Sequence, residues 1–311
     1  MIDPSMRLIF IATGDIALPS FRHLLEHGPR PLALVTQPDK PVGRHQVLTP
    51  PTIKSEALAA GIPVFQPEKI GDITAELAAL DPELLVVMAY GQILRKDILT
   101  LASKAIINLH ASILPKFRGA ACIQAAIDAG DAETGITAMH VVRQLDAGDV
   151  ILIKTIPIAP DETGGTLHDR LALLAPETLS EAIEKLSNGT AARIPQDDSL
   201  SSYISKLERD DGRLDWTQPA AHIARRIRAY DPWPGTFTVA LEGGKEKRLK
   251  IFPPTELAHH HLAPGEVANI DGHLIVGCGK DALRLENVQP DGSRRMSAGD
   301  YLRGRKPESL S

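Results

Sequence analysis

The chain has 311 residues and a formal net charge of −5, with 43% hydrophobic and 23% charged residues. These values predict a soluble globular protein of about two domains. No apolar run reaches the roughly 18 residues of a membrane span, and the N-terminus has no secretory pattern, so a cytoplasmic protein is expected. Cys122 and Cys278 are far apart and lack metal-ligand spacing, which argues against a disulfide framework or a zinc site and favours two buried thiols.

Charge is unevenly shared along the chain. Residues 1–206 carry 18 Lys and Arg against 24 Asp and Glu, whereas residues 207–311 carry 16 against 15, and 11 of those 16 cations are arginines. The C-terminal part is therefore relatively basic. This would suit a phosphate backbone, although a balance of +1 also fits an ordinary solvated surface.

The chain begins with a β–α–β pattern. Residues 6–12 and 31–37 are strand-like, and a helix is expected at about 16–28 between them. The first turn contains no Gly-x-Gly-x-x-Gly, so a dinucleotide site is poorly supported. Residues 38–54 are proline-rich without apolar periodicity, which predicts a long irregular excursion, either functional or simply a mobile surface loop.

The next elements are helices at about 53–60 and 70–80 and an apolar run at 83–91. That run predicts a central parallel strand buried on both faces. It stops at Tyr90-Gly91, where exposed backbone could line a flat ligand. An ordinary strand ended by glycine is the alternative.

Polar side chains follow the strand-like residues 105–110, and the alanine-rich residues after Gly119 predict a helix. Because alternate residues of a strand share a face, Asn108 and His110 point the same way. A second pair of strands, within 135–158, flanks a polar turn that contains Asp146, the natural partner for His110. Each of these residues could instead be an ordinary strand-end or turn former.

The C-terminal part follows a helix at 164–189 and a linker at 190–206. A helix near 220–231 places Ile223, Ile227 and Tyr230 on one face. Short strands at about 236–241, 248–252, 265–270, 273–277 and 282–288 predict a small barrel. Three adjacent histidines at 259–261 favour a solvated loop over a metal site, because they cannot easily converge on one ion.

These motifs resemble the folate-dependent formyltransferases. The resemblance runs from Met6 to about Arg305 and includes residues 37–44 and 231–234. Its central motifs are Asn108-x-His110-x-Ser112-x-Leu114-Pro115, Arg118-Gly119-Ala120-Ala121 and Leu145-Asp146-x-Gly148-Asp149.

The resemblance implies an α/β fold in which residues 1–189 form a Rossmann-like catalytic domain, an open, mainly parallel sheet with helices on both faces. Residues 207–311 would form a smaller OB-like β-barrel that binds tRNA. The implied reaction transfers the formyl group of 10-formyltetrahydrofolate, a cosubstrate, to the α-amine of methionine on initiator Met-tRNA, for translation initiation. No metal is expected, and a monomer is expected.

The resemblance also assigns residues to roles. Asn108, His110 and Asp146 are the expected catalytic residues: Asn108 and His110 would stabilise negative charge on the formyl oxygen, and Asp146 would fix His110 and receive the amine proton. The expected folate-binding residues are Met88, Ala89, Tyr90, Gly91, Ser112, Ile113, Leu114, Pro115 and Gly148.

Two sets of cations are candidates for tRNA binding. Arg44 and Lys54 match basic positions of the loop at 38–54. Arg225, Arg226 and Arg228 are the densest basic cluster, and because they span more than one helix face, at least two are expected to reach solvent. The alternative is a solvated face that pairs with Asp210, Asp211 or Asp215.

Two other functions remain open on the sequence. One is a different folate formyltransferase or a hydrolase, acting on a glycinamide nucleotide, an amino sugar or water. The other is a non-catalytic nucleic-acid-binding protein, which would give Asn108, His110 and Asp146 no reason to converge.

Overall fold

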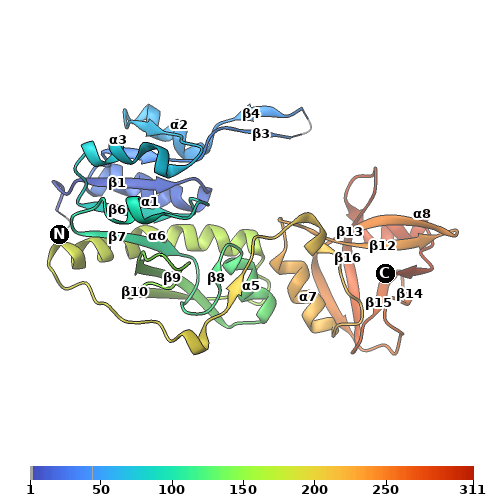
Figure 1. Cartoon of the computed structure of the whole chain (residues 1–311). Coiled ribbons are helices and arrows are strands. Elements are labelled where there is room, and N and C mark those ends of the chain that lie inside the picture. Colours follow the sequence, from blue (N-terminus) through green and yellow to red (C-terminus); the bar gives the residue numbers. More distant parts are fainter. Residues whose placement is uncertain (1–2, 44) are drawn as a thin grey trace. The chain divides into compact units, whose positions relative to one another are not determined.

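A computed structural model describes residues 3–43 and 45–311 of the chain (Figure 1). The chain divides into two compact units. Unit 1 consists of Met1–Cys122, Glu133–Ile156 and His168–Ile204, and unit 2 of Ile123–Ala132, Pro157–Leu167 and Ser205–Ser311.

Unit 1 is built on a seven-stranded sheet in the order β10-β9-β7-β6-β1-β2-β5. Neighbouring strands from β5 to β7 are parallel, and β9 runs antiparallel to β7. The predicted Rossmann-like architecture is confirmed. The strands are β1 (Leu8–Ala12), β2 (Ala33–Val35), β5 (Val64–Phe65), β6 (Leu84–Met88), β7 (Ala105–His110), β9 (Glu133–His140) and β10 (Val150–Pro157).

The apolar runs of β1 and β6 occupy the middle of this sheet, where every residue of both strands is buried. Burial on both faces is what a continuous apolar sequence favours. Strand β7, the neighbour of β6, is apolar as far as Ile107, and Asn108 and His110 then supply polar groups at the carboxyl end of the sheet. In an open α/β sheet, ligands usually bind at that end.

Helices connect these strands. The elements are η1 (Asp15–Ala17), α1 (Leu18–His27), α2 (Thr52–Ala59), η2 (Ile70–Ile73), α3 (Thr74–Ala79), α4 (Lys96–Leu99), α5 (Cys122–Ala129) and α6 (Gly164–Ser187). Residues 123–129 of α5 and 164–167 of α6 fall in unit 2. Leu167, Leu171 and Leu179 of α6 are fully buried, and Leu174 is half-buried. Both cysteines are free and buried, as predicted. Within the described ranges, no helix is long and apolar enough to cross a membrane.

The excursion at 38–54 is not irregular, and that prediction is wrong. Strands β3 (Lys40–Val42) and β4 (Val47–Thr49) form an antiparallel hairpin that extends away from the sheet of unit 1 (Figure 1). Gly43, with φ of 75°, allows the chain to turn. All six strand residues are exposed, so the hairpin has no apolar face to produce a periodic pattern.

Residues 190–204, which follow α6, pair with strands of unit 1. Ile194 pairs with Val150, and η3 (Asp198–Leu200) follows. Strand β11 (Tyr203–Ile204) then pairs in parallel with β8 (Arg118–Gly119).

Unit 2 contains an antiparallel, nearly closed barrel with strand order β14-β15-β16-β13-β12-β18, as predicted for an OB-like domain. Strand β13 is longer than expected and passes an irregularity between Phe252 and Thr255. Ile223 and Ile227 of α7 pack into the core of the barrel. The elements are β12 (Thr236–Glu242), β13 (Lys245–Ala258), β14 (Val267–Ile270), β15 (His273–Gly277), β16 (Ala282–Pro290), β17 (Met296–Ser297), β18 (Ser309–Leu310), η4 (Arg209–Gly212), α7 (Ala220–Ala229) and α8 (Ala298–Gly304).

Candidate active site

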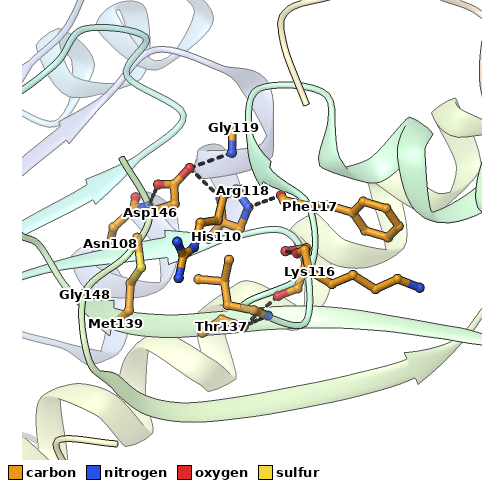
Figure 2. Close-up of polar contacts among 12 residues, drawn as sticks. Asn108, His110, Lys116, Phe117, Arg118, Gly119, Thr137, Met139, Asp146 and Gly148 are labelled. Carbon is orange, nitrogen blue, oxygen red and sulfur yellow. Dashed lines mark hydrogen bonds and ion pairs between the residues drawn. The ribbon is translucent and has the colours of Figure 1, made fainter. Parts of the chain in front are cut away.

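Asn108, His110 and Asp146 converge at the carboxyl end of β7 (Figure 2). The amide nitrogen of Asn108 donates to the Asp146 carboxylate at 3.4 Å, and Nδ1 of His110 lies 3.7 Å from the same carboxylate. Ile107 and Leu109, which alternate with the polar pair, are buried in the core. Strand periodicity therefore aims Asn108 and His110 at one carboxylate.

Asp146 lies in the turn between β9 and β10 and has a left-handed backbone with φ of 48°. Aspartate tolerates that conformation better than most residues. Besides the contacts with β7, its carboxylate accepts a hydrogen bond of 2.8 Å from the backbone N–H of Gly119 (Figure 2). The side chain is only 12% exposed, so its charge acts on its neighbours with little screening by water.

The imidazole of His110 has a hydrogen-bond acceptor at its Nε2 edge and the Asp146 carboxylate 3.7 Å from its Nδ1 edge. Its Nε2 lies 2.9 Å from the carbonyl of Phe117, and because a carbonyl can only accept, Nε2 carries a proton (Figure 2). Burial lowers the pKa of His110, but contacts with Cys122, with the Asp146 carboxylate and with the Phe117 carbonyl outweigh burial and raise it to about 9. The imidazolium is therefore the favoured form at neutral pH.

The loop after β7 is braced by short hydrogen bonds. The hydroxyl of Ser112 donates to the Lys116 carbonyl at 2.7 Å. Thr137 of β9 donates to the Ser112 carbonyl at 2.6 Å and accepts from the N–H of Leu114 at 3.2 Å. Ser112 and Leu114 are buried, whereas Ile113 and Pro115 are half-buried. The predicted folate-binding loop thus has a fixed backbone.

A second predicted folate segment lies at the end of β6, the strand next to β7. Met88 is buried, and Ala89, with φ of 48°, and Gly91, with φ of 82°, are exposed. The carbonyl of Tyr90 accepts a hydrogen bond of 2.6 Å from the side chain of Gln37. Burial raises the pKa of the Tyr90 phenol to about 12, so it stays neutral. Exposed backbone therefore flanks a buried ring at this strand end.

Gly148 closes the Asp146 turn, and the reason it must be glycine is steric. A Cβ atom there would lie 1.7 Å from the carbonyl oxygen of His140. In addition, the N–H of His140 donates to the Asp149 carbonyl at 2.9 Å, so the two chain segments are held together. The close approach of backbones, rather than an unusual φ, requires the missing side chain.

The side chain of Arg118 contacts the segment at 196–203 and not the side chains of Asn108, His110 and Asp146. Its guanidinium is fully buried and bonds to Asp198 at 2.7 Å, to the hydroxyl of Tyr203 at 2.8 Å and to the side-chain oxygen of Gln196 at 2.9 and 3.0 Å. These contacts favour a role for Arg118 in shaping the loop over direct contact with a substrate. The sequence did not single out Gln196 or Tyr203 and indicated only a buried thiol at Cys122, because one polar residue in a linker or one thiol carries no spacing signal.

Of the two candidate tRNA-binding cations of unit 1, the structure describes Lys54. Lys54, in α2, pairs with both carboxylate oxygens of Asp39 at 2.8 Å and is 21% exposed. Gln66 also donates to Asp39 at 2.7 Å, so the ion pair helps to fix the base of the hairpin. Arg44 lies outside the described residues.

The three arginines of α7 each reach solvent in part, and each also has a partner within the chain. All three are half-buried. Arg226 pairs with Asp128 at 2.7 Å, Arg225 donates to the Asp128 carbonyl at 3.1 Å, and Arg228 donates to the Glu162 carbonyl at 2.8 Å. These hydrogen-bond partners come from segments distant in the sequence and not from the nearby acidic residues at 210, 211 and 215.

Fold and site together define a formyl transferase. The formyl transferase family matches residues 6–183, and the formyl transferase C-terminal domain matches residues 206–306. The chain therefore belongs to the formyl transferase family, and within it to the methionyl-tRNA formyltransferases, as its relatives show. It is 51% identical over 304 residues to the methionyl-tRNA formyltransferase of Akkermansia muciniphila and 43% identical over 303 residues to that of Geobacter metallireducens, with 96% of each chain covered in both cases.

Among solved structures, the chain resembles an N-formyltransferase from Helicobacter canadensis in complex with folinic acid and dTDP-3-aminofucose. The TM-score is 0.68 at 18% identity, covering 92% of this chain and 99% of that one. At this identity the likeness shows the fold alone.

Proposed function

We propose that this chain transfers the formyl group of 10-formyltetrahydrofolate to the α-amine of methionine on initiator Met-tRNA. This activity serves translation initiation in the cytoplasm, and the enzyme acts as a monomer. The observation that carries the proposal is the convergence of Asn108, His110 and Asp146 at one strand end, in a chain that aligns nearly end to end with methionyl-tRNA formyltransferases.

The proposed chemistry follows from the charges that the reaction creates. Attack of the neutral amine on the formyl carbon places negative charge on the formyl oxygen and positive charge on the amine nitrogen. The second amide hydrogen of Asn108 and the Nδ1 edge of the His110 imidazolium stabilise the oxygen. Asp146 accepts the amine proton directly or through a water, since its carboxylate is held beside both residues.

Breakdown of this intermediate completes the exchange. The bond between the formyl carbon and N10 of the folate breaks, N10 takes up a proton, and formylmethionyl-tRNA and tetrahydrofolate result. Polarisation and proton movement are sufficient for formyl transfer between amines, and these side chains can supply both, so the proposed mechanism uses no metal.

The folate is proposed to lie across two neighbouring strand ends. The pterin contacts the backbone of Met88–Gly91 after β6, and the loop Ser112–Pro115 and Gly148 complete the site. The exposure of Ala89 and Gly91 and the fixed backbone of the loop support this assignment. A rigid backbone suits a flat ligand because little conformational entropy of the protein is lost on binding.

For tRNA we propose contributions from residues 38–54, which include the hairpin, Arg44 and Lys54 of α2, and from residues 207–311, with Arg225, Arg226 and Arg228. The arginines of α7 would contact phosphate through the part of each side chain that stays exposed. Neutralising one phosphate contact should lower the salt slope of tRNA affinity by about one. Unchanged slopes for all three single alanine variants would place the tRNA surface elsewhere on the barrel.

One assay tests the function directly. The protein is incubated with labelled 10-formyltetrahydrofolate and, in parallel, with Met-tRNA, glycinamide ribonucleotide, an amino-sugar nucleotide or no acceptor. Label in formylmethionyl-tRNA is the expected result. Label in another acceptor, or as free formate at the same rate without acceptor, would favour a different transferase or a hydrolase, and no label anywhere would favour a binding protein.

A further inference from the structure

The side-chain amide of Gln196 joins the Asp146 turn to Arg118. Its Nε2 donates to the carbonyl of Asp146 at 2.9 Å and to the carbonyl of Gly148 at 2.8 Å. Its Oε1 accepts both Nε and Nη2 of Arg118, at 3.0 and 2.9 Å. One half-buried amide therefore uses both of its hydrogens on the turn that carries the proposed catalytic carboxylate.

The orientation of this amide is fixed by its partners. Arg118 can only donate, and the two turn carbonyls can only accept, so exchanging the oxygen and nitrogen of Gln196 would leave every contact mismatched. Arg118 is itself immobile, since it is fully buried and also bonded to Asp198 and Tyr203. The Asp146 turn is thus hydrogen-bonded to the amide of Gln196, and that amide is held in place by the buried guanidinium of Arg118.

Asp146 needs such support because its backbone is in a sparsely populated conformation, with φ of 48°. Its carboxylate must meet Asn108, His110 and the Gly119 amide together. Holding the carbonyl of the same residue, and that of Gly148 two residues later, restricts rotation of the turn. A displacement of about 1 Å at a reacting group can cost on the order of a hundredfold in rate.

We propose that Gln196 is a positioning residue for Asp146, fixed in turn by Arg118; this inference rests on the formyl transfer proposed above. The hydrogen bonds of Gln196 hold the turn so that the carboxylate faces the amine of the bound substrate. Gln196 touches neither substrate nor reacting atoms. Its contribution therefore belongs to the rate of the chemical step and not to the affinity for folate or tRNA.

A purely structural role for Gln196 would be to attach residues 190–204 to unit 1, but backbone pairing already does so. Ile194 pairs with Val150 on one side of Gln196. On the other side, the N–H of Arg118 donates to the Ser202 carbonyl at 2.8 Å, and the N–H of Ala120 donates to the Ile204 carbonyl at 3.0 Å. Removing the two amide donors should leave the segment in place.

The test compares Gln196→Glu with Gln196→Met in the full-length chain. Glutamate keeps, and adds charge to, the acceptor for Arg118 but offers no donor to the turn, whereas methionine has similar length and makes neither contact. Asp198→Asn is the matched control, since Asp198 contacts Arg118 at 2.7 Å without touching the turn. Melting temperature, kcat, and KM for Met-tRNA and 10-formyltetrahydrofolate are measured for each.

Both Gln196 variants should lose about 10- to 100-fold in kcat, with either KM changed less than about threefold. The Glu variant should do so at a melting temperature close to that of the wild type, and Asp198→Asn should stay within about threefold of wild-type kcat. Wild-type kcat in the Glu variant would overturn the inference. If the Glu variant fails to fold, kcat of the Met variant decides in the same way.

The proposed function and this inference fail differently. A wild-type chain that does not formylate Met-tRNA overturns both. A wild-type chain that does so, together with Gln196 variants that change only KM or only melting temperature, overturns the positioning role and leaves the proposed function intact.

Discussion

Replacing Asp146 by Asn probes the electrostatic centre of the proposed site with almost no change in shape. The amide oxygen of Asn can still accept the N–H of Gly119, which now bonds to the carboxylate at 2.8 Å. The negative charge beside His110 is lost, and so is the proposed proton acceptor. The variant should therefore fold normally, and the His110 pKa and the turnover rate should both fall.

The distance between the His110 imidazole and the Asp146 carboxylate sets the expected size of the pKa change. Opposite unit charges separated by 3.7 Å, as for His110 Nδ1 and Asp146, attract by about 4 kcal/mol at an effective dielectric constant of about 20. That corresponds to about three pKa units as an upper bound, and because contact with Cys122 raises the His110 pKa more than Asp146 does, Asp146→Asn should remove only part of the rise from 6.5 to about 9. Loss of a general base costs on the order of 10²- to 10⁴-fold in rate, so kcat should fall by that factor.

The assay is an NMR titration of the His110 imidazole in the wild type and in Asp146→Asn, with kcat measured on the same samples. Cys122→Ala is the control, because the contact with Cys122 also raises the His110 pKa without forming part of the proposed proton transfer. We expect a much larger loss of kcat in Asp146→Asn than in Cys122→Ala. A His110 pKa that stays near 9 in the Asn variant, or a kcat close to wild type, would refute the reasoning.

The same raised pKa links stability to pH. His110 titrates at about 9 when folded and near 6.5 when unfolded, so its stabilising contribution is complete below pH 6.5 and is lost as pH rises through 9. The contribution is at most about 3 kcal/mol. Chemical denaturation between pH 6 and 10 should show this loss in the wild type and a smaller loss in Asp146→Asn, in which the contacts with Cys122 and the Phe117 carbonyl remain.

Other predictions follow from individual contacts. Asn108→Ala should lower kcat by about two to three decades, equivalent to roughly 3 to 4 kcal/mol, with an unchanged melting temperature; a rate within a few-fold of wild type would contradict its role at the oxyanion. Trimming the hairpin at 38–54 should raise KM for Met-tRNA and leave folate affinity unchanged, and equal loss of both would mean that the hairpin is structural. Arg226→Ala, which leaves the Asp128 carboxylate with His222 at 3.4 Å but without its arginine partner, should cost about 2 kcal/mol in unfolding free energy, measured by denaturant titration against Arg303→Ala at an exposed pair. Gly148→Ala should abolish activity and lower the melting temperature, since its Cβ would lie 1.7 Å from a carbonyl oxygen; a fully active alanine variant would show that the turn relaxes.

The sequence alone predicts much of the fold because an element that buries one face carries apolar residues at the period of a helix or a strand. The apolar runs of β1 and β6, the helical repeat of α6 and the five short strands of the barrel all follow from which face each element buries. Asn108 and His110 are likewise readable as a pair, since strand alternation fixes their common direction. The exposed hairpin at 38–54 was missed because nothing on it is buried and no periodicity results.

Only the tertiary structure decided the long-range partners. Asp128 for Arg226, Asp39 for Lys54 and Gln196 for the Asp146 turn are each brought from another part of the chain by packing. Single polar residues such as Gln196 carry no spacing signal, and the acidic residues nearest to an arginine in sequence are not those nearest in space. Side-chain hydrogen bonds depend on distances of a few ångströms, and those distances are set by how whole elements pack, which local sequence patterns do not encode.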